Sequence, residues 1–256
     1  VKMTEPIQRK PDWLKIKLPK GTNYAQVKSI VQRYNLHTIC TSGKCPNMGE
    51  CWAAGTATLM ILGDICTRSC KFCATKTGHP LPPDVNEPQN VAESIRLMGL
   101  KHAVITSVDR DDLPDKGASH WAKTILEIKK LTPGTTMEVL IPDFDGIEDL
   151  ITLVIDAKPD IISHNLETVR RLTPLVRSRA KYDVSLQVIK TIAASDVVAK
   201  SGIMVGLGET RDEIQETMDD LLTVGCKVFT IGQYLQPTTS HLPVVEYVHP
   251  DVFEEY

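Results

Sequence analysis

Short runs rich in β-branched residues alternate along this chain with runs whose apolar residues follow the period of a helix. Such alternation indicates βα units, which place their strands side by side in a parallel sheet. We expect six strands, at residues 58–62, 103–107, 136–141, 160–164, 203–207 and 227–231. Their spacing of about 30 residues is typical of one closed or nearly closed α/β barrel, in which reactive groups lie on loops at the carboxyl ends of the strands.

Two of the intervening runs have clear helical periodicity. In the first, apolar residues recur at i, i+3, i+4, i+7 and i+8, which predicts a helix with one buried stripe. These residues are Ile147, Leu150, Ile151, Val154 and Ile155. A second helix is predicted by the apolar residues Ile214, Met218, Leu221 and Leu222. This second helix begins with Thr210 and Glu213, which have the spacing of a capping box, and it ends at Gly225, which favours helix termination.

Cysteine is distributed very unevenly, because six of the seven cysteines lie between Cys40 and Cys73. The amino-terminal stretch is too polar for a secretory signal, and no apolar run reaches the roughly 18 residues of a membrane span. We therefore expect a cytoplasmic protein, or one of an organelle matrix or stroma. Thiols stay reduced there, so closely spaced cysteines more often bind metal than form disulfides.

The overall charge argues against nucleic acid as a partner. Lys+Arg 29 against Asp+Glu 32 leaves a formal net charge of -3, with no concentrated basic stripe. Nucleic-acid binding normally needs such a stripe. Small-molecule or protein substrates fit this composition better.

Cys66, Cys70 and Cys73 form the pattern C-x3-C-x2-C directly after the first expected strand. Three thiolates can hold a four-iron cluster and leave one iron with an open coordination position, which is where substrates bind. The alternative is that this spacing lines one helix face with buried thiols, since free cysteine packs as a small apolar residue. The polar neighbours Arg68 and Lys71 favour the cluster.

Cys40, Cys45 and Cys51 form a second triplet, C-x4-C-x5-C, again without a fourth cysteine. A structural zinc site is the alternative here, because His37 lies three residues before Cys40 and zinc accepts three cysteines and one histidine. A non-enzymatic binding module, with cysteines that serve only as structural ligands, is a further alternative for the chain. Structural metal sites normally have every coordination position filled by the protein, whereas each triplet offers only three cysteines. This argues against a purely structural role.

The two patterns together resemble a known family. C-x3-C-x2-C after the first strand is similar to the AdoMet (S-adenosylmethionine) radical enzymes, and the upstream C-x4-C-x5-C resembles the lipoyl synthases. Similarity continues from Arg9 to about Tyr256, through RKPDWLKIKLP, GTATLMILGD, ITSVDRDDLPD, PDIISHNLET, KSGIMVGLGET and IGQYLQPT. The resemblance implies a partial (β/α)6 barrel at residues 58–256, preceded by a cysteine-rich extension at residues 1–57.

The resemblance also implies the activity and its cofactors. Two sulfur atoms would be inserted at C6 and C8 of an octanoyl chain on a lysine of a carrier domain. Cys66, Cys70 and Cys73 would hold the [4Fe-4S] cluster that binds AdoMet. Cys40, Cys45 and Cys51 would hold an auxiliary [4Fe-4S] cluster that donates sulfur. No side chain would act as a catalyst, because the cofactors supply the radical chemistry.

Further residues and partners follow from the same resemblance. The candidate AdoMet contacts are Asp109, Asn165, Glu167, Arg177, Gly202, Gly206 and Glu209. The alternatives are a solvated face for Asp109, a polar loop cap for Asn165 and Glu167, and a carrier-peptide contact for Arg177. The implied partners are octanoylated lipoyl domains of 2-oxoacid dehydrogenase E2 subunits, the glycine cleavage H protein, and an electron donor such as ferredoxin or flavodoxin.

One departure from the family pattern concerns the auxiliary cluster. The family completes the coordination of this cluster with a serine of an Arg-Ser-Ser-Tyr motif near the carboxyl terminus. This motif is not found in the sequence, which ends at PDVFEEY, and Ser178 in VRSRA is not part of such a motif. We therefore expect the fourth ligand to be missing, and a longer tail to be needed for multiple turnover. The alternative function is another radical AdoMet enzyme whose auxiliary cluster only relays electrons.

Overall fold

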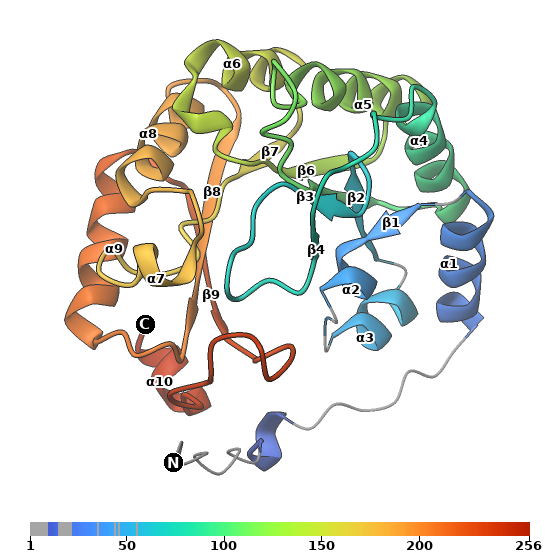
Figure 1. Cartoon of the computed structure of the whole chain (residues 1–256). Helices are drawn as coiled ribbons and strands as arrows, with labels where there is room; N and C mark the ends of the chain where they lie inside the picture. The colour runs from blue at the N-terminus through green and yellow to red at the C-terminus, as the bar shows by residue number, and fades with distance from the viewer. Residues whose placement is uncertain (1–9, 15–21, 35, 44, 46, 55) are drawn as a thin grey trace.

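One sheet of seven strands forms the centre of the molecule (Figure 1). The computed structural model describes residues 10–14, 22–34, 36–43, 45, 47–54 and 56–256. In spatial order the strands are β1 (His37–Thr38), β2 (Thr58–Ile61), β5 (His102–Ser107), β6 (Thr136–Leu140), β7 (Ile161–Ser163), β8 (Val198–Val205) and β9 (Val228–Gln233). The strands from β2 to β9 are parallel, whereas β1 pairs antiparallel with β2. The predicted six-stranded parallel α/β barrel is confirmed, and among the described residues no ladder joins β9 to β1, so it is open there.

The helices form an arc outside the strands (Figure 1). This arc contains α4 (Glu87–Met98), α5 (Ala118–Leu131), α6 (Glu148–Asp156), α8 (Tyr182–Ala193) and α9 (Arg211–Thr223). The amino-terminal extension contributes η1 (Asp12–Leu14), α1 (Thr22–Arg33), α2 (Ile39–Ser42) and α3 (Met48–Ala53). Shorter elements are the strands β3 (Ile65–Cys66) and β4 (Lys76–Thr77), and the helices η2 (Phe144–Gly146), α7 (Thr173–Val176) and α10 (Pro250–Glu255). Within the described segments, no helix has the length and apolarity that crossing a membrane requires.

One predicted strand boundary was wrong. We expected the fifth parallel strand to begin at residue 203, but β8 begins at Val198. The polar residues Lys200 and Ser201 resemble a loop in the sequence. Lys200 nevertheless pairs in register with Ser163 and Val228, and its ammonium group binds the carboxylate of Glu138 on β6 at 2.9 Å. A partly buried ion pair therefore accompanies the polar part of this strand.

The two predicted helices are present. In α6, Ile151 and Val154 are buried as the apolar stripe predicts, but Ile147 precedes the helix as its N-cap and is 44% exposed. In α9, Ile214 and Leu221 are buried, but Leu222 is 71% exposed and lies outside the stripe. The capping box at the start of α9 is confirmed. Thr210 accepts from the Glu213 backbone N–H at 3.3 Å, and the Glu213 carboxylate accepts from the Thr210 N–H at 2.8 Å.

Two apolar cores hold the chain together. The larger core lies between the sheet and the outer helices. The smaller core belongs to the extension and contains Val27, Val31, Cys40, Trp52 and Ala57. Partly buried Leu36 and Met98 pack against both cores, so the extension is attached to the barrel beside α4.

Removal of the α9 cap should destabilise the fold in a way that unfolding measurements detect. We expect Thr210→Ala to lower the free energy of unfolding by about 1 kcal/mol, because the backbone N–H of Glu213 loses its acceptor. Urea unfolding followed by circular dichroism measures this change. Thr223→Ala is the matched control, since that hydroxyl only donates to the Asp219 carbonyl one turn earlier, at 2.9 Å. Equal effects of the two substitutions would contradict the assignment.

Candidate active site

A cavity of ≈ 220 Å³ lies at the carboxyl ends of the parallel strands. Its wall includes Cys66 at the end of β3, Asp109 after β5, Asp143 after β6 and Asn165 after β7. Parallel strands bring their carboxyl ends to one edge of the sheet, which is where α/β barrels place their active sites. The cavity is therefore the candidate active site.

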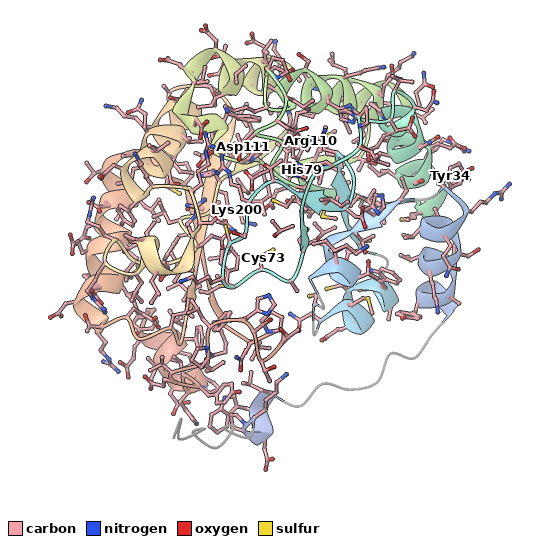
Figure 2. All side chains as sticks on the ribbon, viewed as in Figure 1. Tyr34, Cys73, His79, Arg110, Asp111 and Lys200 are labelled. Carbon is pink, nitrogen blue, oxygen red and sulfur yellow. The ribbon has the colours of Figure 1, made fainter. Side chains whose placement is uncertain are left out.

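Cys66, Cys70 and Cys73 all line this cavity. They lie on the loop that leaves β3 and returns in β4, and two pairs of residues close the base of that loop, Ile65 with Lys76 and Cys66 with Thr77. In Figure 2, Cys73 lies on this loop inside the arc of strands and helices. The first triplet therefore faces one space, as the sequence predicts.

The loop that carries this triplet is fixed by backbone contacts from distant parts of the chain. The Lys71 N–H donates to the Val176 carbonyl at 2.9 Å, and the Leu242 N–H donates to the Lys71 carbonyl at 3.2 Å. His241 bonds through a ring nitrogen to the Cys73 carbonyl at 3.0 Å. The loop is thus held by α7 and by the segment after β9.

The donor set of this loop suits an iron-sulfur cluster. Burial, reinforced by the nearby charge of Asp109, raises the pKa of the Cys66 thiol to about 12. Burial also raises the pKa of Cys73, and Cys70 adds to that shift. Bound metal stabilises thiolates directly, and soft thiolate ligands favour iron-sulfur clusters. Three thiols at one cavity therefore fit a cluster with one iron open toward the cavity.

The second triplet lies in the extension. Cys40 is in α2, Cys51 is in α3, and the Cys45 N–H donates to the Cys40 carbonyl at 3.0 Å. Burial raises the pKa of Cys45, and the charges of Cys40 and Cys51 add to that shift. Ile39, which precedes Cys40, lines the same cavity as the first triplet. The segment that carries Cys40 therefore reaches the candidate active site through Ile39.

The zinc alternative gains no support from the geometry. His37 lines a separate cavity of ≈ 200 Å³, beside Asp64 and Glu87. In the part of the chain that the structure describes, no group of three or more His, Cys, Asp or Glu side chains is arranged to hold a single metal ion.

Four of the candidate AdoMet contacts line the cavity: Asp109, Asn165, Glu167 and Arg177. Burial raises the pKa of the Glu167 carboxyl, and the Arg177 charge opposes that shift. Gly202 lies directly behind Asn165, since a Cβ at this glycine would stand 3.2 Å from the Asn165 Oδ1. The backbone of β8 thus approaches the cavity at Gly202.

Gly206 and Glu209 lie outside the cavity wall. The Glu209 carboxylate accepts from the backbone N–H groups of Gly206 and, at 2.9 Å, of Leu207. Gly206 has a φ of 102°, and a Cβ there would collide with Gln233 and with the Glu246 carbonyl. Both residues therefore shape the turn after β8.

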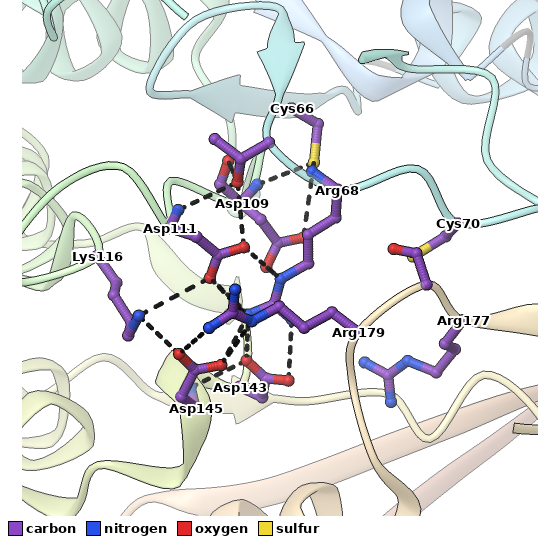
Figure 3. A network of polar contacts seen from close by, with 12 residues as sticks. Cys66, Arg68, Cys70, Asp109, Asp111, Lys116, Asp143, Asp145, Arg177 and Arg179 are labelled. Atoms are coloured by element: carbon purple, nitrogen blue, oxygen red, sulfur yellow. Dashed lines mark hydrogen bonds and ion pairs between the residues drawn. The ribbon is translucent and has the colours of Figure 1, made fainter. Parts of the chain in front are cut away.

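A network of charges beside the cavity was not predicted (Figure 3). The buried Arg68 guanidinium donates to Asp111 at 2.8 Å and to Asp143 at 2.8 and 2.9 Å. These bonds outweigh the opposing effect of burial and raise the pKa of Arg68, and Arg68 holds the pKa of Asp143 well below its usual range. The sequence feature that points to this network is that its acidic residues follow two predicted strands, 103–107 and 136–141.

A buried histidine forms part of the cavity wall. His164 contacts the Ile141 carbonyl and the Ser185 hydroxyl, each at 2.9 Å, and burial together with the Arg177 charge lowers its pKa to about 4. Arg177 donates to the same Ser185 hydroxyl at 2.8 Å. His164 and Ser185 therefore orient Arg177 at the cavity.

Comparison with known proteins adds two family matches. The model of the Radical SAM superfamily matches residues 60–221, and the N-terminal domain of lipoyl synthase of the Radical SAM family matches residues 2–45. Lipoyl synthase of Phocaeicola vulgatus is 68% identical over 97% of this chain and 87% of its own length. Lipoyl synthase of Treponema denticola is 64% identical over 97% of this chain and 86% of its own length. The chain belongs to the lipoyl synthase family. Lipoyl synthases are radical SAM enzymes, so membership implies a [4Fe-4S] cluster and S-adenosylmethionine.

Solved structures support the fold of this lipoyl synthase family member. Methylornithine synthase has a TM-score of 0.58 at 11% identity, covering 88% of this chain and 62% of that chain. Streptococcus suis SuiB bound to S-adenosylmethionine has a TM-score of 0.60 at 11% identity, covering 89% of this chain and 55% of that chain. At such low identity these likenesses concern the fold alone.

The depressed pKa of His164 predicts how acid affects stability. The unfolded chain binds a proton at this histidine near its ordinary pKa of 6.5, whereas the folded chain binds it only near 4. The unfolded state therefore holds more protons between these values, and the His164 contribution to stability is lost as the pH falls from about 6.5 towards 4. His164→Gln should remove this component, so its unfolding free energy should fall less between pH 7 and pH 5. Parallel pH profiles in urea unfolding would contradict this.

Proposed function

We propose that this chain inserts two sulfur atoms at C6 and C8 of an octanoyl chain bound to a lysine of a lipoyl carrier domain. The observation that carries the proposal is the placement of Cys66, Cys70 and Cys73 at one cavity, at the carboxyl ends of the parallel strands, with Ile39 of the extension on the same wall. The membership of the chain in the lipoyl synthase family supports the same reaction. The carrier domains would be those of 2-oxoacid dehydrogenase E2 subunits and the glycine cleavage H protein, with ferredoxin or flavodoxin as electron donor.

The two parts of the chain have separate roles in this proposal. Residues 58–256 form the barrel and hold one [4Fe-4S] cluster through Cys66, Cys70 and Cys73. Residues 1–57 hold the auxiliary [4Fe-4S] cluster through the cysteines of α2 and α3 and the loop between them. The small core around Trp52 supports this division, because its buried members all precede residue 58. The closeness of Ile39 to the barrel cavity supports transfer of sulfur between the two parts.

Polar residues of the cavity would hold AdoMet in place. When bound, the cluster and AdoMet supply a carbon-centred radical, which can take hydrogen from an unactivated carbon. Asp109 and Arg177 offer opposite charges to the amino and carboxylate groups of AdoMet, and Asn165 and Glu167 offer hydrogen bonds to its ribose. Gly202 lets the β8 backbone approach the same region.

The remaining wall of the cavity suits an aliphatic substrate. Ile39, Phe72, Leu140 and Ile141 line it together with the cysteines. An octanoyl chain gains stability when its methylene groups leave water, at roughly 0.8 kcal/mol for each buried CH₂. Exclusion of water would also protect a reactive radical from side reactions. These apolar residues support binding of the octanoyl chain beside the barrel triplet.

The mass of an octanoyl-lysyl peptide tests the proposal. We expect a gain of two sulfurs and a loss of two hydrogens after anaerobic incubation with the reconstituted chain, AdoMet and dithionite. A product with one sulfur that stays cross-linked to the chain would also support sulfur insertion. An unchanged peptide with formation of 5'-deoxyadenosine would contradict the substrate and favour a relay role for the auxiliary cluster.

Two cysteine variants separate the proposed roles of the triplets. Cys70→Ala should abolish 5'-deoxyadenosine formation, because the AdoMet-binding cluster loses a ligand. Cys45→Ala should retain 5'-deoxyadenosine formation but insert no sulfur. Liquid chromatography with mass spectrometry measures both products in one sample. Sulfur insertion by Cys45→Ala would exclude the upstream triplet as the holder of the sulfur donor.

A further inference from the structure

Arg68 lies between two cysteines of the barrel triplet but carries no metal-binding group. We propose that Arg68 is a positioning residue, which holds the loop from Cys66 to Cys73 in its cluster-binding shape by cross-linking it to the loops after β5 and β6. This inference rests on the proposed function, in which that loop holds the AdoMet-binding cluster. It assigns a task to the one buried cation within the cysteine pattern.

The guanidinium of Arg68 makes contacts in two directions. Its Nε and Nη2 atoms donate to Asp111 at 2.8 Å each, and its Nη1 and Nη2 atoms donate to Asp143 at 2.9 and 2.8 Å. Asp111 follows β5 and Asp143 follows β6, so one planar fork joins the cysteine loop to the ends of two strands. Only arginine presents donors in this rigid arrangement, because a lysine ammonium acts as a single point charge.

The anchored part of the loop determines the surroundings of Cys66. The backbone N–H groups of Arg68 and Asp109 each point at the Cys66 sulfur at 3.4 Å. The neighbouring Thr67 donates its N–H and its hydroxyl to the Asp109 carbonyl at 3.1 and 3.0 Å. Hydrogen bonds to ligating sulfurs raise the reduction potential of a cluster. Arg68 would therefore influence both the retention and the potential of the cluster.

The rest of the network shows that the surrounding charges depend on Arg68. The side chain of Asp143 is 2% exposed, and Arg68 is the cation that binds it. Lys116 and Arg179 lie nearby, but each makes its shortest contact with Asp145, at 2.7 and 2.8 Å (Figure 3). Loss of the Arg68 fork would leave the buried Asp143 without its guanidinium partner. Asp111 would keep the longer ion pairs with Lys116 and Arg179, at 3.9 and 3.8 Å.

The test compares Arg68→Lys with Arg171→Lys in the full chain, reconstituted anaerobically with iron and sulfide. Arg171 is a suitable control because it makes a comparable fork to Glu213 on the outside of the barrel, away from the cysteine loop. Electron paramagnetic resonance of the reduced protein identifies the barrel cluster, since its signal changes when AdoMet is added. The second cluster in the same molecule is an internal standard.

In the presence of an iron chelator, we expect Arg68→Lys to lose the AdoMet-responsive signal several-fold faster than the unsubstituted chain. We also expect a lower reduction potential for that cluster. The auxiliary cluster and the Arg171→Lys variant should behave as in the unsubstituted chain. Equal loss of both clusters, or loss at the unsubstituted rate, would overturn the inference. An unsubstituted chain without an AdoMet-responsive signal would instead refute the proposed function.

Hydrogen exchange of the metal-free chain gives a second readout that needs no cluster. In Arg68→Lys, we expect faster exchange at the Thr67 and Lys71 amides, which donate to the Asp109 and Val176 carbonyls. The amides of β8 should keep their protection. Unchanged exchange in the loop would show that other contacts hold its shape and would overturn the inference.

Discussion

The parallel direction of six strands is the constraint on which the rest of the structure depends. Because β2 and β5 to β9 all run the same way, their carboxyl ends meet at one rim, and chemistry-bearing residues far apart in sequence become neighbours. Cys66 and Arg177 are separated by more than one hundred residues in the chain, yet they line the same cavity. The helices of the outer arc cover the apolar outer face of this sheet and so keep the rim in place.

The extension solves a geometric difficulty posed by the two cysteine triplets. An extended strand lies between them, and a strand of five or six residues spans close to 20 Å. The structure reverses the chain before that strand. The short strand β1 pairs antiparallel with β2, and α2 follows it immediately, which brings Ile39 to the cavity. An edge strand of only two residues is sufficient to orient this segment.

Local sequence patterns predicted the features that depend only on residues close together in the chain. The β-branched runs, the helical stripes and the capping box of Thr210 and Glu213 each arise within a short stretch of chain, and each is present. The Arg68 network could not be foreseen in this way, because its partners are 43 and 75 residues away. Glu209 illustrates a different limit. The family resemblance suggested it as an AdoMet contact, and no sequence pattern indicated that its carboxylate accepts from the backbone N–H groups of Gly206 and Leu207.

The hydrogen bonds from residues 241 and 242 to the cysteine loop have a consequence for the order of events during synthesis. A growing chain that has not yet reached Leu242 lacks the donor to the Lys71 carbonyl, although all six clustered cysteines have already emerged. Domains fold as units once their chain is complete. The cysteine loop therefore gains these contacts only after more than 160 further residues have been added beyond Cys73.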